Sequence, residues 1–96
     1  MNKYNRYNYS VNTYNKSGNI EIPALTNGIT VTNTGDTICT VNGMVLYPGT
    51  PGTSLGDSRS IGGNENEILY SKLLNISFTP GGTSPNVEVI IKYYII

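Results

Sequence analysis

Histidine and tryptophan are absent from this 96-residue chain, which contains a single cysteine, Cys39, and a single phenylalanine. Without histidine, neither a histidine-based catalytic triad nor an imidazole metal site can form. The lone cysteine excludes an intrachain disulfide and lacks the histidine that would activate it as a nucleophile. The six acidic residues lie mostly in loop-like segments and form no recognisable catalytic pair. We therefore expect a protein that is not an enzyme and that uses no cofactor or metal.

Charge is also scarce, since charged residues make up 12% of the chain and six basic side chains balance six acidic ones. A neutral molecule has no strong long-range attraction to nucleic acid or to a membrane surface. No apolar run approaches the roughly 18 residues that a membrane-spanning helix requires, and the N-terminus lacks the apolar core of a secretory signal. We expect synthesis in a cytoplasm and no membrane partner. Low charge suits the core of a protein–protein interface, where charged residues are depleted.

The first nineteen residues contain three basic side chains, four tyrosines and no acid. Alternating basic and aromatic residues can bind single-stranded nucleic acid, but three charges release few counterions, so we do not expect nucleic acid as a partner. Tyrosine and asparagine are well suited to protein contacts. We predict an extended arm over residues 1–19, ordered only in an assembly, and a packed domain over residues 20–96. The predicted partner-binding residues of the arm are Lys3, Tyr4, Arg6, Tyr7, Tyr9 and Tyr14.

Beyond the arm, short runs of β-branched residues alternate with glycine and proline, and no window has the apolar period of a helix. Seven or eight short strands predict an all-β fold, an antiparallel β-sandwich that is Ig-like or jelly-roll-like. The predicted strands are Ile20–Leu25, Gly28–Asn33, Thr37–Val41, Met44–Tyr47, Ile68–Ser71, Leu73–Thr79 and Val87–Ile95, with a weaker one over Asp57–Ile61.

Two turns make the strand predictions more specific. Asn42-Gly43 lies between β-type runs and favours a two-residue type I′ hairpin, which would pair Val41 with Met44 and Cys39 with Leu46. For the preceding turn we prefer a three-residue loop over residues 33–35 with Gly35 in the left-handed region, which pairs the two flanking strands. This register places their apolar residues on the same face as Cys39, which is then a small buried hydrophobe rather than a reactive thiol.

The last strand has one uniformly apolar side and one mixed side. The mixed side carries Glu88 and Ile90 followed by the three residues that we predict to bind a partner, Lys92, Tyr94 and Ile96. A strand with a half-apolar outer face needs a cover, because an exposed edge of this kind invites aggregation. The cover is either the arm of the same chain or a neighbouring subunit. The sixteen residues from Pro48 to Gly63 remain open between a tolerated surface loop and a binding loop.

Three stretches of the sequence carry a resemblance to a known class of proteins. They are GITVTNTGDTICTVNGMVLYPG, SLGDSRSIGGNENEI and LNISFTPGGTSPNVEVIIKYYI, which together cover roughly residues 26–96. This arrangement of a T-V-T-N-T-G hairpin, a polar loop and a final aromatic–aliphatic strand resembles small virion proteins of tailed bacteriophages. It looks most like head auxiliary or decoration proteins of crAss-like phages. The PGTPGT segment departs from the pattern, and the Tyr/Asn arm has no counterpart in it.

The resemblance implies a structural role in a virion, with the protein made in the host cytoplasm. The chain would bind the major capsid protein or the connector, together with copies of itself, and would have no small-molecule substrate. The alternative hypothesis is a receptor- or carbohydrate-binding tip domain of a fibre. In that case the loop residues Tyr70, Asn64 and Asn66 would contact glycans.

Overall fold

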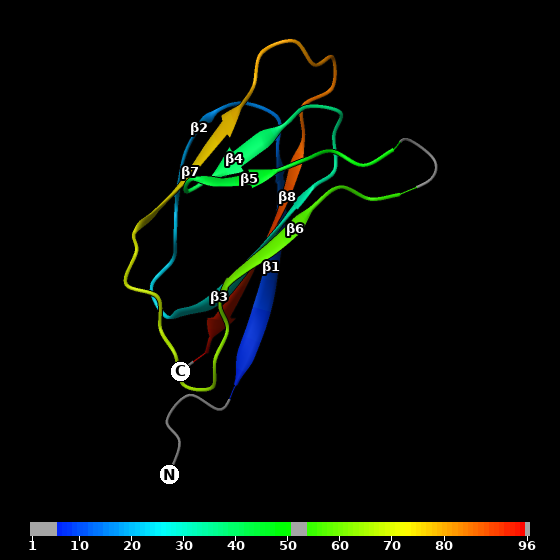
Figure 1. Cartoon of the computed structure of the whole chain (residues 1–96). Coiled ribbons are helices and arrows are strands. Elements are labelled where there is room, and N and C mark those ends of the chain that lie inside the picture. The colour runs from blue at the N-terminus through cyan, green and yellow to red at the C-terminus, as the bar shows by residue number, and fades with distance from the viewer. Residues whose placement is uncertain (1–5, 51–53, 96) are drawn as a thin grey trace.

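The computed structural model describes residues 6–50 and 54–95, which form eight β-strands and no helix (Figure 1). The all-β antiparallel sandwich predicted from the sequence is confirmed, since two four-stranded antiparallel sheets pack face to face. The strands are β1 (Tyr7–Tyr14), β2 (Gly18–Glu21), β3 (Thr26–Asn33), β4 (Cys39–Val41), β5 (Met44–Leu46), β6 (Ser58–Gly62), β7 (Leu73–Phe78) and β8 (Val87–Tyr94).

The strand order is that of a jelly roll rather than of an immunoglobulin domain. Sheet A has the order β1-β8-β3-β6 and sheet B has the order β2-β7-β4-β5. The pairs β1–β8, β2–β7, β3–β6 and β4–β5 are all antiparallel, so the chain forms one long hairpin whose two halves run alongside each other. Rolling this hairpin brings β8 against β3 and β7 against β4, which closes the two sheets. Eight strands in two sheets with this connectivity are the jelly-roll architecture.

The two-residue turn at Asn42-Gly43 is the tip of this long hairpin. Its residues have φ angles of 48° and 84°, as a type I′ turn requires. The predicted pairs Val41–Met44 and Cys39–Leu46 are both present. Three of these four side chains are buried, and Met44 is half-buried at the rim.

The predicted hairpin between the strands on either side of residues 33–35 is wrong. β3 belongs to sheet A and β4 to sheet B, so the connection crosses from one sheet to the other and the two strands do not pair. Gly35 does not have a positive φ. A glycine is needed there because a Cβ would collide with the backbone of Ser84 and Asn86 in the β7–β8 loop. The shared burial that suggested pairing arises because both sheets face one core.

The core lies between the inner faces of the two sheets. Its fully buried side chains come from β3, β4, β5, β7 and β8, and Tyr14, Ile20, Phe78 and other half-buried residues pack around them. The buried apolar residues are Ile29, Val31, Cys39, Val41, Leu46, Leu74, Ile76, Val87, Val89 and Ile91. Burial raises the pKa of the Cys39 thiol, which keeps it neutral, and its buried position agrees with the structural role predicted for it.

Two buried asparagines lie at opposite ends of β3 and hold the loops that cap the sandwich. The Asn27 side-chain amide donates to the carbonyl oxygens of Asn64 and Glu67 and to the Tyr94 hydroxyl, at 2.8–2.9 Å. The Asn33 amide donates to the carbonyl oxygens of Thr37 and Leu46 at 2.7 and 2.9 Å. Because buried carbonyl groups left without a donor cost about 1–3 kcal/mol each, these amides stabilise the loop conformations that complete the core.

The predicted loose arm is largely part of the sandwich. Residues 7–14 form β1 and pair with β8 along their whole length, and β2 begins at Gly18 and pairs with β7. The prediction that this segment is ordered only in an assembly is therefore wrong for residues 7–14, because the unpaired edge of β8 supplies its partner. Of the two covers considered for the last strand, the structure has the one from the same chain. A division at residue 19 would separate β1 from sheet A and would cut through β2, which runs from Gly18 to Glu21.

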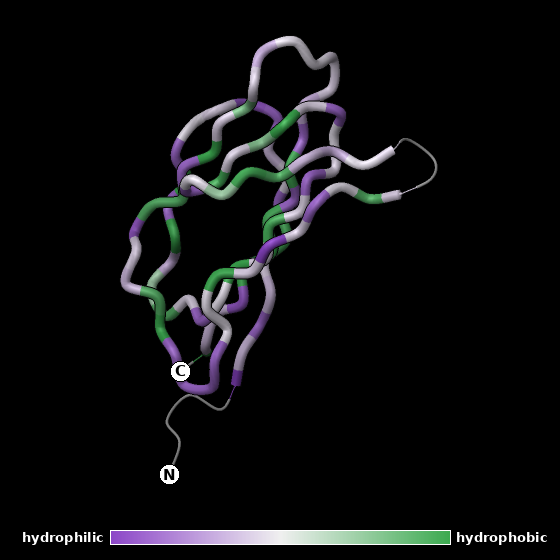
Figure 2. Tube along the Cα trace, in the orientation of Figure 1, coloured by the Kyte–Doolittle hydropathy of each residue, from purple (hydrophilic) through white to green (hydrophobic). Residues whose placement is uncertain are grey.

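Smaller differences concern the connections between the sheets. The predicted strand Ile68–Ser71 is absent, since this segment crosses from sheet A to sheet B and makes a bond from Leu69 N to Thr26 O in place of a ladder. The strand predicted to reach Leu25 ends at Glu21, before Pro23 and a positive φ of 65° at Leu25. These two connections lie beside each other and place hydrophobic residues at the lower left of the sandwich (Figure 2).

The turn at the tip gives a direct test of the fold. A Cβ at Gly43 and one at Gly18 would both meet no atom within 4 Å, but only Gly43 has a positive φ. We expect Gly43→Ala to lower the free energy of unfolding by about 1 kcal/mol, because an L-residue is strained in the left-handed region. Gly18→Ala is the matched control and should be neutral or slightly stabilising. Equal effects of the two substitutions in urea unfolding would contradict the type I′ assignment.

Candidate docking surface

The outer face of sheet A is built from rows of side chains that cross all four strands. Residues directly opposite each other share a face, so the register defines each row. The rows, read from β1 through β8 and β3 to β6, are Tyr9-Lys92-Gly28-Gly62, Val11-Ile90-Thr30-Ser60 and Thr13-Glu88-Thr32-Ser58. Among the described residues of these rows, Lys92 and Glu88 are the only charged ones. The face is therefore flat, nearly neutral and rich in hydroxyl groups.

Large side chains gather at the β1 side of this face. Tyr9 is 54% exposed and Val11 is 58% exposed, and Tyr7 lies next to Tyr9 with its ring centroid 5.8 Å away in an edge-on arrangement. The Lys92 ammonium lies 4.1 Å from the centroid of the Tyr7 ring, which is a cation–π contact. These contacts hold the two rings on the surface in fixed positions, so little conformational entropy remains to be lost when a partner covers them.

Toward β6, the face becomes a ladder of small side chains with a shallow groove. The hydroxyl groups of Thr32 and Ser58 lie 2.9 Å apart. A groove of about 180 Å³ runs over Gly28 and Gly63 between Tyr9 and Ser60. A Cβ at Gly28 would lie 2.9 Å from the Gly63 backbone, so a glycine is required for the strands to approach here. A flat face with one shallow groove fits a protein surface better than an enclosed small molecule.

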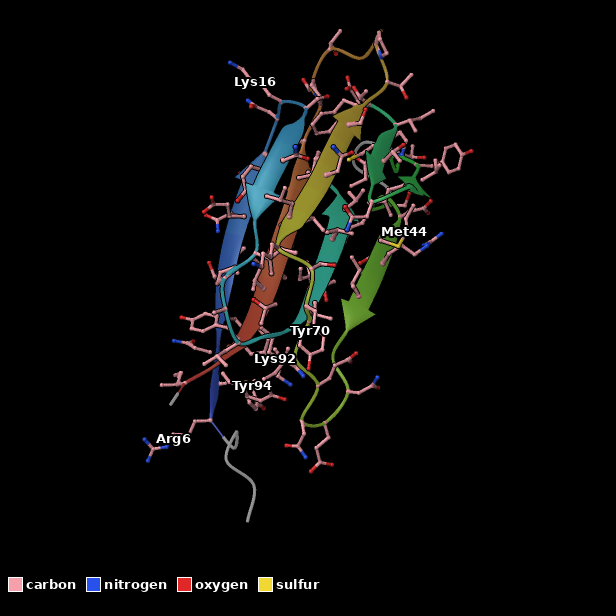
Figure 3. The ribbon with its side chains drawn as sticks, turned by 90° about the vertical axis from the view of Figure 1, so that its left-hand side faces the viewer. Arg6, Lys16, Met44, Tyr70, Lys92 and Tyr94 are labelled. Carbon is pink, nitrogen blue, oxygen red and sulfur yellow. The ribbon has the colours of Figure 1, made fainter. Side chains whose placement is uncertain are left out.

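The structure brings some of the predicted partner-binding residues together and separates others. Tyr7 and Tyr9 are exposed on β1, Arg6 is exposed directly before it, and Lys92 lies beside them on β8. Arg6 and Lys16, which are labelled in Figure 3, lie just beyond the two ends of β1. Lys3, Tyr4 and Ile96 lie outside the described residues.

Two predicted contact residues point inward instead. Tyr14 packs against the core. Tyr94 is only 7% exposed and its hydroxyl accepts a hydrogen bond from Asn27, so a contact role for it conflicts with its burial. The residues that sequence reasoning missed are Val11, Ile90, Thr30 and Ser60. The available signal was the recurrence of a large side chain at every second position, namely Tyr7, Tyr9 and Val11. This spacing is informative only once residues 7–14 are recognised as a strand.

A second surface is a polar cleft of about 850 Å³ at the end of the sandwich where four connections meet. Asp36 holds its wall together: the carboxylate accepts bonds from the Thr83 hydroxyl, the Thr83 and Ser84 amides and the Thr37 hydroxyl, at 2.6–3.2 Å. These bonds, with that of the Thr83 hydroxyl the strongest, lower the pKa of Asp36 from 3.8 to about 2. All of its acceptor sites serve the fold, so Asp36 is a loop anchor.

A third surface is an apolar groove of about 520 Å³ between the β2–β3 and β6–β7 connections. Tyr70 on its rim is 94% exposed, and Asn64 and Asn66 lie in the same β6–β7 connection. This connection and the polar cleft lie at opposite ends of β3. Asn27, near the start of β3, binds Asn64 in the connection, whereas Asn33, at the end of β3, binds Gly35 in the wall of the cleft. The three residues proposed for glycan contact therefore do not line the large polar cleft.

Within residues 6–50 and 54–95, no three His, Cys, Asp or Glu side chains come close enough together to hold a metal ion. The same residues contain no helix long and apolar enough to cross a membrane. Comparisons with known protein families, with curated proteins and with solved structures gave no match.

The anchoring role of Asp36 predicts a pH-dependent loss of stability. A pKa lowered from 3.8 to about 2 in the folded state means that the charged carboxylate stabilises the fold above pH 3.8. This stabilisation is lost as the pH falls through about 2. We expect Asp36→Asn to lower the Tm near neutral pH, and the difference from wild type to shrink between pH 3.8 and about 2.

Thermal unfolding followed by circular dichroism at a series of pH values measures this difference. The control is Glu65→Gln, which removes the same charge from an exposed position in the β6–β7 connection. An Asp36→Asn difference that stays constant down to the lowest pH would contradict the anchoring role.

Proposed function

We propose that this chain is a non-enzymatic structural subunit of a phage virion, an auxiliary or decoration protein that binds the capsid shell or the connector. The observation that carries the proposal is the outer face of sheet A, where the exposed Tyr7, Tyr9 and Val11 adjoin a flat neutral ladder of hydroxyl groups. Aromatic residues held rigidly on an uncharged surface are the usual centre of a protein–protein contact.

The fold and its size are compatible with this role. Jelly rolls occur in viral capsid proteins, although they also occur in lectins, so the architecture alone does not select a function. The sequence resemblance to small virion proteins supplies the specific partner class. A core of ten fully buried apolar side chains is small, and attachment to a larger particle would add stability by mass action.

The experiment removes the aromatic centre of the face without touching the core. We expect the double variant Tyr7→Ser and Tyr9→Ser to be incorporated into particles at least about 30-fold more weakly than wild type, since central aromatic residues contribute about 2 kcal/mol or more. Tyr70→Ser is the matched control, because Tyr70 is equally aromatic, is exposed on a loop and lies outside this face. It should be incorporated normally.

Quantitative mass spectrometry of purified particles gives the copy number of each variant. Absence of the wild-type chain from particles would overturn the virion role. Equal incorporation of the double variant and wild type would overturn the docking face while leaving the virion role standing.

A second candidate is a receptor- or carbohydrate-binding domain that uses the polar cleft at the end of the sandwich. The observation in its favour is the lining of that cleft, which offers amide and hydroxyl groups from Asn15, Thr34, Ser54 and Asn86. Binding of the isolated chain to a glycan array, lost in Asn86→Ala but kept in the Tyr7/Tyr9 variant, would favour this function. The described residues that line the cleft include no aromatic side chain, which argues against this function because sugars usually stack on aromatic faces.

A further inference from the structure

Among the residues that the structure describes, no strand pairs with the outer edge of β1, and this edge differs from the other three sheet edges. Natural edge strands are usually short, charged or interrupted, which prevents them from pairing with another chain. β2 has four residues including Glu21, β5 has three, and β6 has five including Arg59. β1 has eight residues, YNYSVNTY, with no charge, proline or glycine. Its edge thus lacks each of these protections.

The hydrogen bonds of β1 show which of its backbone groups face outward. Ile95 N donates to the carbonyl oxygen of Arg6, which directly precedes β1. In an antiparallel pair every second residue bonds to the neighbouring strand, so the residues of β1 that bond to β8 are Asn8, Ser10, Asn12 and Tyr14. The backbone groups of Tyr7, Tyr9, Val11 and Thr13 therefore point away from β8. Tyr9 N donates to the Asn8 side chain at 2.8 Å, which agrees with an amide on the open edge.

From this edge we infer that a second copy of the chain binds β1 through antiparallel β1–β1 pairing about a two-fold axis at Ser10. In this register Tyr7 lies opposite Thr13 of the second copy and Tyr9 lies opposite Val11. All four outward-facing residues are then used, and each pair can exchange two hydrogen bonds once the Asn8 side chain releases the Tyr9 amide. The two A sheets join into one continuous sheet with a single outer face.

The side chains of β1 complement themselves in this register. On the inner side, Asn8 meets Asn12 of the second copy and Ser10 meets Ser10, so amides and hydroxyl groups face their own kind at non-hydrogen-bonded positions, where side chains are closest. On the outer side, the Val11 row meets the Tyr9 row of the other copy. The two-fold axis reverses the direction of the second outer face. Glu88 of one copy therefore lies nearer to Lys92 of the other copy than to its Glu88, so like charges stay apart. A strand without charges is what an interface between identical chains needs, because each side chain meets its own copy.

The biological purpose of this dimer rests on the assembly role proposed above, but dimer formation is measured on the purified chain alone. A contact this small is expected to be weak, so sedimentation velocity should be run up to about 1 mM. The wild-type chain should dimerise with rising concentration. Val11→Pro removes an outward-facing amide, and it should abolish the dimer while keeping the Tm. Val45→Pro is the matched control, since the Val45 amide also points outward, on the β5 edge of sheet B.

Crosslinking tests the register itself. Ser10→Cys places the thiols of the two copies opposite each other on the axis, within disulfide distance. Asn12 lies opposite Asn8 of the second copy, so the Asn12 positions of the two copies are four residues apart along the paired strands. With oxidised glutathione added as the oxidant, Ser10→Cys should form the intermolecular disulfide at least about tenfold faster than Asn12→Cys, because pairing gives the thiols a millimolar effective concentration. The native Cys39 is buried and does not compete.

Two outcomes would overturn the pairing. One is a wild-type chain that stays monomeric over the whole concentration range, and the other is crosslinking at Ser10 no faster than at Asn12. Neither outcome affects the docking role, which is measured by incorporation into particles. Conversely, a dimer that fails to enter particles would leave the pairing intact and remove the proposed virion role.

Discussion

The register of the Asn42-Gly43 turn is the constraint on which the rest of this structure depends. Both residues have positive φ, so the strands on either side of the turn, β4 and β5, lie directly opposite each other. The next three strand pairs continue the same hairpin outward to β1 and β8. A shift of one residue at the tip would turn Cys39 and Val41 out of the core. The strands that lie farthest apart in the chain, β1 and β8, thus belong to the same long hairpin as the two residues at its tip.

The same topology places β1 where it can act on another molecule. In sheet A, β1 is an edge strand, and its partner β8 lies between β1 and β3. The outer face of sheet A is then continuous from the exposed tyrosines of β1 to the hydroxyl ladder of β3 and β6. Sheet B has shorter strands. One face and one edge of the molecule therefore combine flatness, neutrality and exposed aromatic rings, and both proposals concern this surface.

Local sequence signals were sufficient for most of the strands after residue 25 and for the tip of the hairpin. Asn-Gly between alternating apolar residues specified the pairs Val41–Met44 and Cys39–Leu46, and the alternation in Val87–Ile91 specified the core face of β8. The connection after β3 could not be predicted in this way, because a short polar turn is compatible with a hairpin or with a crossing between sheets. Asn27 and Asn33 share the parity of Ile29 and Val31, which places them inward, but only the positions of distant carbonyl groups explain why polar side chains are stable there. β1 was assigned to an arm because its inner side chains are polar and its partner strand lies at the other end of the chain.

Amide hydrogen exchange along residues 7–14 tests most directly whether β1 is an ordered edge strand that presents a docking surface. Pairing with β8 predicts slow exchange at Asn8, Ser10 and Asn12 in the dilute isolated chain, and fast exchange at Val11 and Thr13. The two outward-facing amides should become protected when the protein is concentrated or bound to a particle. Uniformly fast exchange of all these amides in the isolated chain would show a loose arm and contradict both the edge strand and the surface built on it.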